Sequence, residues 1–197
     1  NFKVLPNSSD STPGPQHRGT IHFEETIHEI HEAYSESYTS KLPSKRPVIE
    51  MTIPSSLDKT IAPEGKHVVQ LFTQYAPYHL PEGCSWDDPG RREEYAQSVY
   101  NIIEEYCPGF KESILYEDLL SPLDIERVFG LKGGNIFHGS ISLDQLYWQR
   151  PAEKWSRHTT PIKGYFMAAS GTHPGGGVMG SCGKNAAQVV LSKADFH

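Results

Sequence analysis

The sequence lacks the features that identify several common protein classes. Its 197 residues include only three cysteines with no CxxC pair, so a disulfide framework is not expected. The formal net charge is -6 and there is no run of Lys or Arg, which argues against nucleic acid as a partner. No apolar run approaches the ~18 residues of a membrane-spanning helix. The residues from Asn1 onward resemble no signal peptide or amphipathic presequence, and we expect the chain to be part of a longer protein.

Turn-forming residues dominate the beginning of the chain, and a helix is predicted after them. Residues 1–19 contain Ser, Pro, Gly and Asp but almost no apolar side chains, so a loop is expected there. The apolar residues that then recur at helical spacing are Phe23, Ile27, Ile30 and Tyr34. They predict a short amphipathic helix.

Two strands are predicted from alternation and from the density of β-forming residues. Residues 49–53 carry apolar side chains at every second position, which indicates a strand with one exposed face. Residues 68–75 are richer in β-forming residues, so we expect this strand to be the more central of the two.

Two further helices are predicted from their start and stop signals. Asp88 would cap the first, with a proline at its first position, and the helix would end before Pro108. Its core-facing residues would be Tyr95, Val99, Ile102, Ile103 and Tyr106. Ser121 would cap the second, with Asp124 satisfying further amides, and this helix would close at Gly130.

A glycine-rich segment near the end of the sequence is its most informative feature. Residues 164–170 indicate an apolar strand, residues 171–180 a turn with five glycines, and a helix is predicted to follow. Within the turn, residues 175–180 match the GxGxxG dinucleotide pattern. A Rossmann unit also needs a second parallel strand and an acidic residue about twenty positions further on, and the chain ends at His197. We therefore interpret the segment as one wall of a flavin pocket whose other walls lie outside this chain.

The turn can bind a ligand through its backbone. Glycine leaves the main chain bare, so a ligand can approach it closely. The first amides of the following helix carry the positive end of the helix dipole, and we expect Gly177, Val178 and Met179 to supply them. The alternative is an ordinary strand–turn–helix connection without a ligand. Five glycines are excessive for a connection, because each costs chain entropy.

The run Ser170-Gly-Thr-His-Pro-Gly-Gly-Gly-Val-Met-Gly180, with Lys184-Asn-Ala-Ala187 behind it, resembles a known motif. It is similar to the C-terminal flavin motif of the phytoene desaturase-like FAD-dependent oxidoreductases, a branch of the amine-oxidase-type flavoproteins. Other segments that share the resemblance are residues 47–50, 53–58, 72–75, 129–131, 133–138 and 142–147. The resemblance therefore spans essentially the whole chain.

The resemblance implies a fold and a cofactor. The fold would be α+β: residues 20–160 would form a substrate-side domain of mixed β-sheet with flanking helices. Residues 161–197 would be a terminal β–α unit of an FAD-binding, Rossmann-like domain that is otherwise absent from this chain. Ser170 and Gly171 would lie beside the ribityl–pyrophosphate linkage of FAD, and many relatives carry an acid at the position of Ser170. Residues 178–180 would lie under the flavin ring.

Further residues are implied on the substrate side of the flavin. These candidates are His138, Tyr147 and Trp148. For the two aromatic residues, plain core packing is an equally good interpretation. We find no convincing general acid or base, which suits flavin chemistry, because the cofactor carries the reaction and the protein supplies orientation.

Other patterns are better explained as structure. Residues 177–185 resemble a P-loop, but the spacing and the final residue are wrong. The histidines in residues 22–31 lack the order of a zinc site, and a solvated helix face is favoured; no metal is expected. Cys182 is interpreted as a small core residue rather than a reactive thiol. His173 is interpreted as a turn residue, with a ligand contact as the less favoured alternative.

We therefore predict the C-terminal part of an FAD-dependent oxidoreductase that dehydrogenates or saturates an apolar substrate, with hydride passing to or from flavin N5. The longer parent would be the enzyme, and this chain alone would be inactive. The alternative is a flavoprotein-derived protein that binds or regulates a protein partner without turnover. The resemblance alone implies a location in the mitochondrial matrix.

Overall fold

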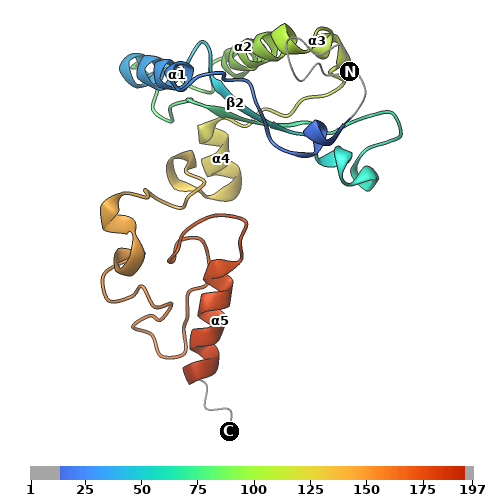
Figure 1. The fold of residues 1–197 in the computed structure, drawn as a ribbon. Coiled ribbons are helices and arrows are strands. Elements are labelled where there is room, and N and C mark those ends of the chain that lie inside the picture. Colours follow the sequence, from blue (N-terminus) through green and yellow to red (C-terminus); the bar gives the residue numbers. More distant parts are fainter. Residues whose placement is uncertain (1–13, 194–197) are drawn as a thin grey trace. The chain divides into compact units, whose positions relative to one another are not determined.

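The computed structural model describes residues 14–193, in two compact units that divide between Ser121 and Pro122 (Figure 1). The first unit contains β1 (Ile21–His22), α1 (Ile27–Ser40), β2 (Val48–Thr52), β3 (Gln70–Gln74), α2 (Arg91–Tyr106) and α3 (Phe110–Ser113). The second contains α4 (Pro122–Phe129) and α5 (Ser181–Lys193). Single 3₁₀ turns lie at Pro15–Arg18, Pro54–Ser56, Lys59–Ile61, Lys132–Gly134, Leu143–Gln145 and Tyr147–Gln149. This content confirms the α+β class. Of the loop predicted at residues 1–19, residues 1–13 lie outside the described part.

A three-stranded antiparallel sheet is the centre of the first unit. β2 is the middle strand, and in it Met51 lies opposite Ile21 of β1 and Leu71 of β3. The predicted alternation in β2 is confirmed, because Ile49 and Met51 are buried while Glu50 is partly exposed. Two predictions are wrong: the described sheet is antiparallel rather than mixed, and β3 is an edge strand. Propensity for β structure reports how well side chains pack on a pleated surface and not how many neighbours a strand has.

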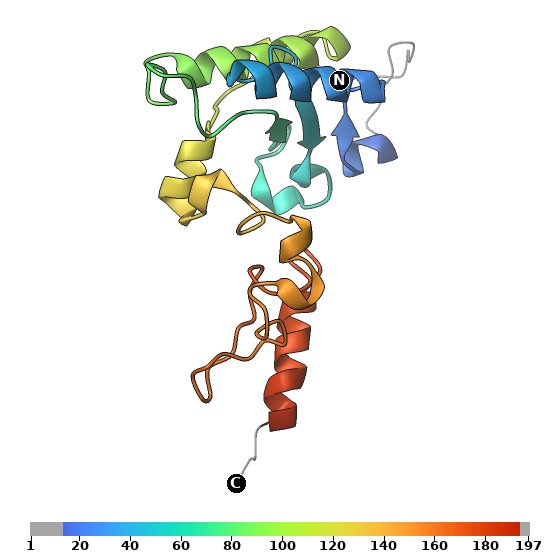
Figure 2. The ribbon, with the colours of Figure 1, turned by 90° about the vertical axis from the view of Figure 1, so that its left-hand side faces the viewer.

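α2 and α1 lie on one side of this sheet (Figure 2). The core of this unit lies between the sheet and α2, and its buried residues are Phe23, Ile49, Met51, Ala96, Val99, Tyr100, Ile102, Ile103 and Cys107. The predicted core-facing stripe of α2 is therefore confirmed. The start of the helix is not, because α2 begins at Arg91 after Gly90, whose φ is 79°. The carboxylate of Asp88 instead accepts a hydrogen bond from the Ser85 N–H (2.8 Å) and stabilises the preceding turn.

α1 forms as predicted, but its apolar stripe does not face the core of this unit. Ala33 and Ser37 are its buried residues, whereas Ile27 is 86% exposed. The helix begins with a capping box, in which Thr26 Oγ1 accepts from the Glu29 N–H (3.3 Å) and the Glu29 carboxylate accepts in return from the Thr26 N–H (3.3 Å).

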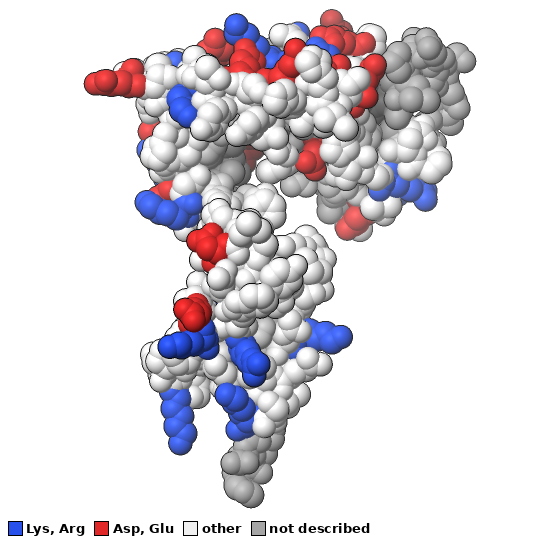
Figure 3. Space-filling view, turned by 60° about the vertical axis from the view of Figure 1, so that its left-hand side comes forward, with Lys and Arg blue, Asp and Glu red and all other residues white. Residues whose placement is uncertain are grey.

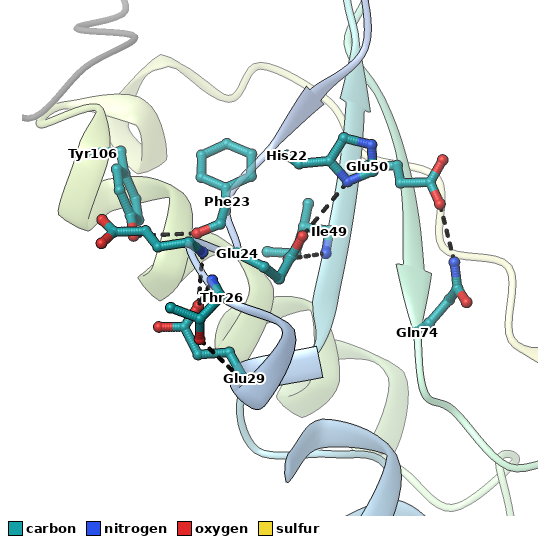
Figure 4. Close-up of polar contacts among 10 residues, drawn as sticks. His22, Phe23, Glu24, Thr26, Glu29, Ile49, Glu50, Gln74 and Tyr106 are labelled. Atoms are coloured by element: carbon teal, nitrogen blue, oxygen red, sulfur yellow. Dashed lines mark hydrogen bonds and ion pairs between the residues drawn. The ribbon is translucent and has the colours of Figure 1, made fainter. Parts of the chain in front are cut away.

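The segment between β1 and α1 is held to the rest of the unit by partly buried polar contacts (Figure 4). The Glu24 carboxylate accepts from the Ile49 N–H of β2 (2.7 Å) and lies 3.5 Å from His22 Nδ1. The Tyr106 hydroxyl donates to the Phe23 carbonyl (3.2 Å), and the two rings meet edge to face with centroids 5.4 Å apart. These contacts hold Phe23 in the core, so the chain enters α1 from a fixed point.

We expect the first unit to lose stability as the pH rises from about 10 to 12. Burial raises the pKa of Tyr95 to about 12, although its hydroxyl also donates a hydrogen bond to Thr73 (2.9 Å). A pKa that is higher in the folded state gives stability below the ordinary tyrosine pKa of about 10, and this stability is lost as the pH passes the folded value. The Tyr95 contribution would be about 3 kcal/mol, since each pKa unit corresponds to about 1.4 kcal/mol.

The measurement is urea unfolding between pH 9 and 12, compared between the natural protein and Tyr95→Phe. The slope of stability against pH should be shallower in Tyr95→Phe. It should not vanish, because burial also raises the pKa of Tyr100 and Cys107. Tyr116→Phe is the matched control, since Tyr116 is exposed. Equal slopes in Tyr95→Phe and the natural protein would contradict the prediction.

The second unit has little regular structure between its two helices. α4 ends as predicted at Gly130, which has φ 70° and donates its N–H to the Glu126 carbonyl (2.8 Å). The strand predicted at residues 164–170 is wrong, because the described residues contain only an isolated bridge between Thr159 and Phe166 there. A strand needs a neighbour for its backbone hydrogen bonds, and no other strand lies in this unit among residues 122–193.

Candidate functional site

The glycine-rich turn before α5 has a backbone that requires glycine at several positions. Gly175, Gly177 and Gly180 have φ values of 112°, 143° and 65°, a region that other residues rarely adopt. A Cβ on Gly177 would also lie 2.6 Å from Cε of Met179. Gly171 has no such φ, and nothing lies within 4 Å of a Cβ placed on it. Gly175, Gly177 and Gly180 therefore shape the turn, whereas Gly171 is not required by the backbone.

The helix after the turn begins too late in the sequence for residues 177–179 to supply its first amides, as was predicted. The Gly180 carbonyl accepts the first helical hydrogen bond, from the Lys184 N–H (3.0 Å), and α5 starts at Ser181. The amides without a partner inside the helix are therefore those of residues 181–183. The prediction that residues 177–179 supply these amides is wrong, because the positive φ values of the turn keep its backbone non-helical up to residue 180. Whether residues 177–179 contact a cofactor stays a prediction.

Apolar side chains are exposed at the tip of the turn. Val178 is fully exposed and Met179 largely so. Behind the tip, Cys182 is buried, and its Sγ donates to the carbonyls of Gly175 (3.2 Å) and Thr172 (3.6 Å). Cys182 thus joins the start of α5 to the turn, as expected for a small core residue.

Two of the three substrate-side candidates lie together. The rings of Tyr147 and Trp148 stack with centroids 5.9 Å apart, and Tyr147 lies 5.9 Å from the ring of His173 in the glycine-rich turn. Both Tyr147 and Trp148 are largely exposed, so plain core packing is not their role in this unit. His138 is exposed, has φ 57°, and does not join this aromatic group among the described residues.

Arg150 is a buried charged residue that the sequence analysis missed. Its side chain is 2% exposed, and its Nη2 donates to the carbonyls of Phe137 (2.6 Å) and Ser170 (3.0 Å). Its Nη1 donates to the Ser140 carbonyl (3.4 Å). One arginine in a polar loop gives no signal in the sequence, because its importance depends on burial that distant segments create.

The residues present fit part of a flavin site. The turn exposes bare backbone, α5 presents its first amides close behind, and the buried Nε of Arg150 has no hydrogen-bond partner. From Pro122 to Lys193 the sequence has eight Lys or Arg and four Asp or Glu, although the whole chain is acidic. Figure 3 shows this difference, with acidic groups crowded on the first unit and basic groups on the second. The free amides of α5, the buried Arg150 and the excess of basic residues all favour a ligand with negative charge.

The chain is similar in sequence to part of several known proteins. It is 50% identical over 193 residues to pyridine nucleotide-disulfide oxidoreductase domain-containing protein 2 of Rattus norvegicus, which is 97% of this chain and 33% of that protein. The Mus musculus protein gives the same identity and coverage. A more distant relative is the 4,4'-diapophytoene desaturase (4,4'-diaponeurosporene-forming) of Staphylococcus aureus, with 28% identity over 134 residues, 67% of this chain and 26% of that enzyme.

These relationships confirm the resemblance predicted from the glycine-rich motif. The chain is a homologue of pyridine nucleotide-disulfide oxidoreductase domain-containing protein 2 and spans about a third of its length. No family model matches the chain. Within residues 14–193, none of the helices is both long and apolar enough to cross a membrane.

Proposed function

We propose that this chain forms part of the cofactor and substrate site of an FAD-dependent oxidoreductase that acts on an apolar substrate. The observation that carries the proposal is the turn of positive-φ glycines leading into α5, in a chain half identical to an oxidoreductase-domain protein. A backbone of this kind binds a phosphate-bearing cofactor without any catalytic side chain. The proposed location of the whole protein is the mitochondrial matrix.

Each part of the site has a role in this proposal. FAD would supply the hydride chemistry at its N5. Ser170 and Gly171 would hold the ribityl–pyrophosphate linkage, and residues 178–180 would lie under the ring, where the apolar side chains exclude water. The dipole of α5 would favour negative charge on the ligand by about 0.3–1 kcal/mol.

The aromatic group beside the turn supports an apolar substrate. Tyr147 and Trp148 offer exposed stacked rings next to His173, a surface that binds flat or extended hydrocarbon by burial. The same exposed rings favour a second candidate function, the docking of a protein partner without turnover, because aromatic side chains are enriched where proteins meet.

The test is to purify the full-length natural protein and to measure bound flavin and its reduction. We expect FAD in a stoichiometric amount, bleached under anaerobic conditions when a saturated or partly unsaturated hydrocarbon chain is added. Purified protein that neither contains nor binds FAD would contradict the proposal. Bound FAD that no such substrate reduces, together with a stoichiometric protein partner in a pull-down, would favour the second candidate.

A further inference from the structure

Arg150 connects segments that meet behind the glycine-rich turn. It reaches the Phe137 and Ser140 carbonyls on one side and the Ser170 carbonyl, where the flavin-like motif begins, on the other. Its Nε is buried without a partner and lies 3.8 Å from the position that a Cβ would take on Gly175. The guanidinium thus lies against the beginning of the motif at Ser170 and against the turn at Gly175.

The charge of this guanidinium is not neutralised by the described residues. Arginine stays protonated in proteins, and no described Asp or Glu forms an ion pair with it. Backbone carbonyls solvate a buried cation without cancelling its charge, so the burial is unfavourable until an anion arrives. The start of α5 meets the same turn through the Cys182–Gly175 hydrogen bond. Two sources of positive potential therefore converge on one short stretch of backbone.

We propose that Arg150 is a positioning residue of the cofactor site, whose charge selects a ligand that carries phosphate. This inference rests on the proposed function and concerns the pyrophosphate of FAD, because the carbonyl that Arg150 holds belongs to Ser170. The charge favours FAD over riboflavin, which has the same ring and no phosphate. The arginine touches the backbone rather than the reacting atoms, so its effect is on binding preference.

The experiment compares dissociation constants for FAD and riboflavin in the full-length natural protein and in Arg150→Gln and Arg150→Lys. We expect Arg150→Gln to weaken FAD binding about tenfold or more and riboflavin binding much less. Arg150→Lys keeps the charge and should retain most of the preference for FAD. Arg157→Gln is the matched control, because Arg157 is exposed, and its preference should equal that of the natural protein.

A second pair of variants keeps the arginine in place. Ser140→Asp puts a carboxylate on a residue whose carbonyl already accepts from Arg150, and Ser140→Asn adds a neutral group of the same size. The preference for FAD should fall in Ser140→Asp and not in Ser140→Asn. If Arg150→Gln does not fold, this pair of variants still tests the proposal.

The outcomes separate the two proposals. If the natural protein does not bind FAD, the proposed function fails. If it binds FAD but Arg150→Gln keeps the same preference, or loses FAD and riboflavin binding equally, Arg150 has no role in selecting phosphate. Equal preferences in Ser140→Asp and Ser140→Asn would also overturn the inference.

Discussion

Gly177→Val is expected to abolish the retention of FAD by the full-length natural protein. Gly177 has φ 143°, where a residue with a Cβ is strained, and valine adds a branch at that atom. Strain of this kind costs about 1–3 kcal/mol. The new side chain would also meet the Met179 side chain at the tip of the turn. The backbone of the turn would therefore take a different conformation, and it would lose its contacts with the cofactor.

The measurement is the ratio of flavin to protein absorbance after purification and dialysis. Gly19→Val is a matched control, because Gly19 has φ -109° and nothing lies within 4 Å of a Cβ placed on it. This control should keep its flavin, and circular dichroism should show that both variants fold. An unchanged flavin content in Gly177→Val would contradict the proposal that this turn binds the cofactor.

Ile103→Ala is expected to destabilise the first unit by about 2–5 kcal/mol. Ile103 of α2 is completely buried, in the same core cluster as the equally buried Ile49 of β2. Truncation removes apolar contacts and leaves a cavity that the close-packed surroundings fill only in part. A loss of this size is a large share of the stability of a typical domain, about 5–15 kcal/mol.

The free energy of unfolding in urea measures this effect. Ile27→Ala is the matched control, because it makes the same substitution on a helix at a residue that is 86% exposed. Its stability should stay within about 0.5 kcal/mol of the natural protein. A loss below 1 kcal/mol in Ile103→Ala would mean that α2 does not pack on the sheet as described.

Local patterns in the sequence were sufficient for much of the first unit. Alternation in residues 49–53 predicted β2, and helical spacing in residues 95–106 predicted the buried face of α2, since each pattern is a property of a single element. The same approach was wrong about which strand is central and which face of α1 is buried. Those features depend on the neighbours of an element, which its own residues do not specify.

In the candidate site too, some features follow from local sequence and others only from the tertiary structure. The sequence by itself determined a glycine-rich turn opening a helix and the resemblance to flavin oxidoreductases, because positive-φ turns need glycine and such motifs are local. Only the tertiary structure decided that α5 starts at Ser181, that residues 164–170 form no strand, and that Tyr147 meets His173. It alone revealed Arg150, because burial of a charge is created by segments that are distant in sequence and meet only when the chain folds.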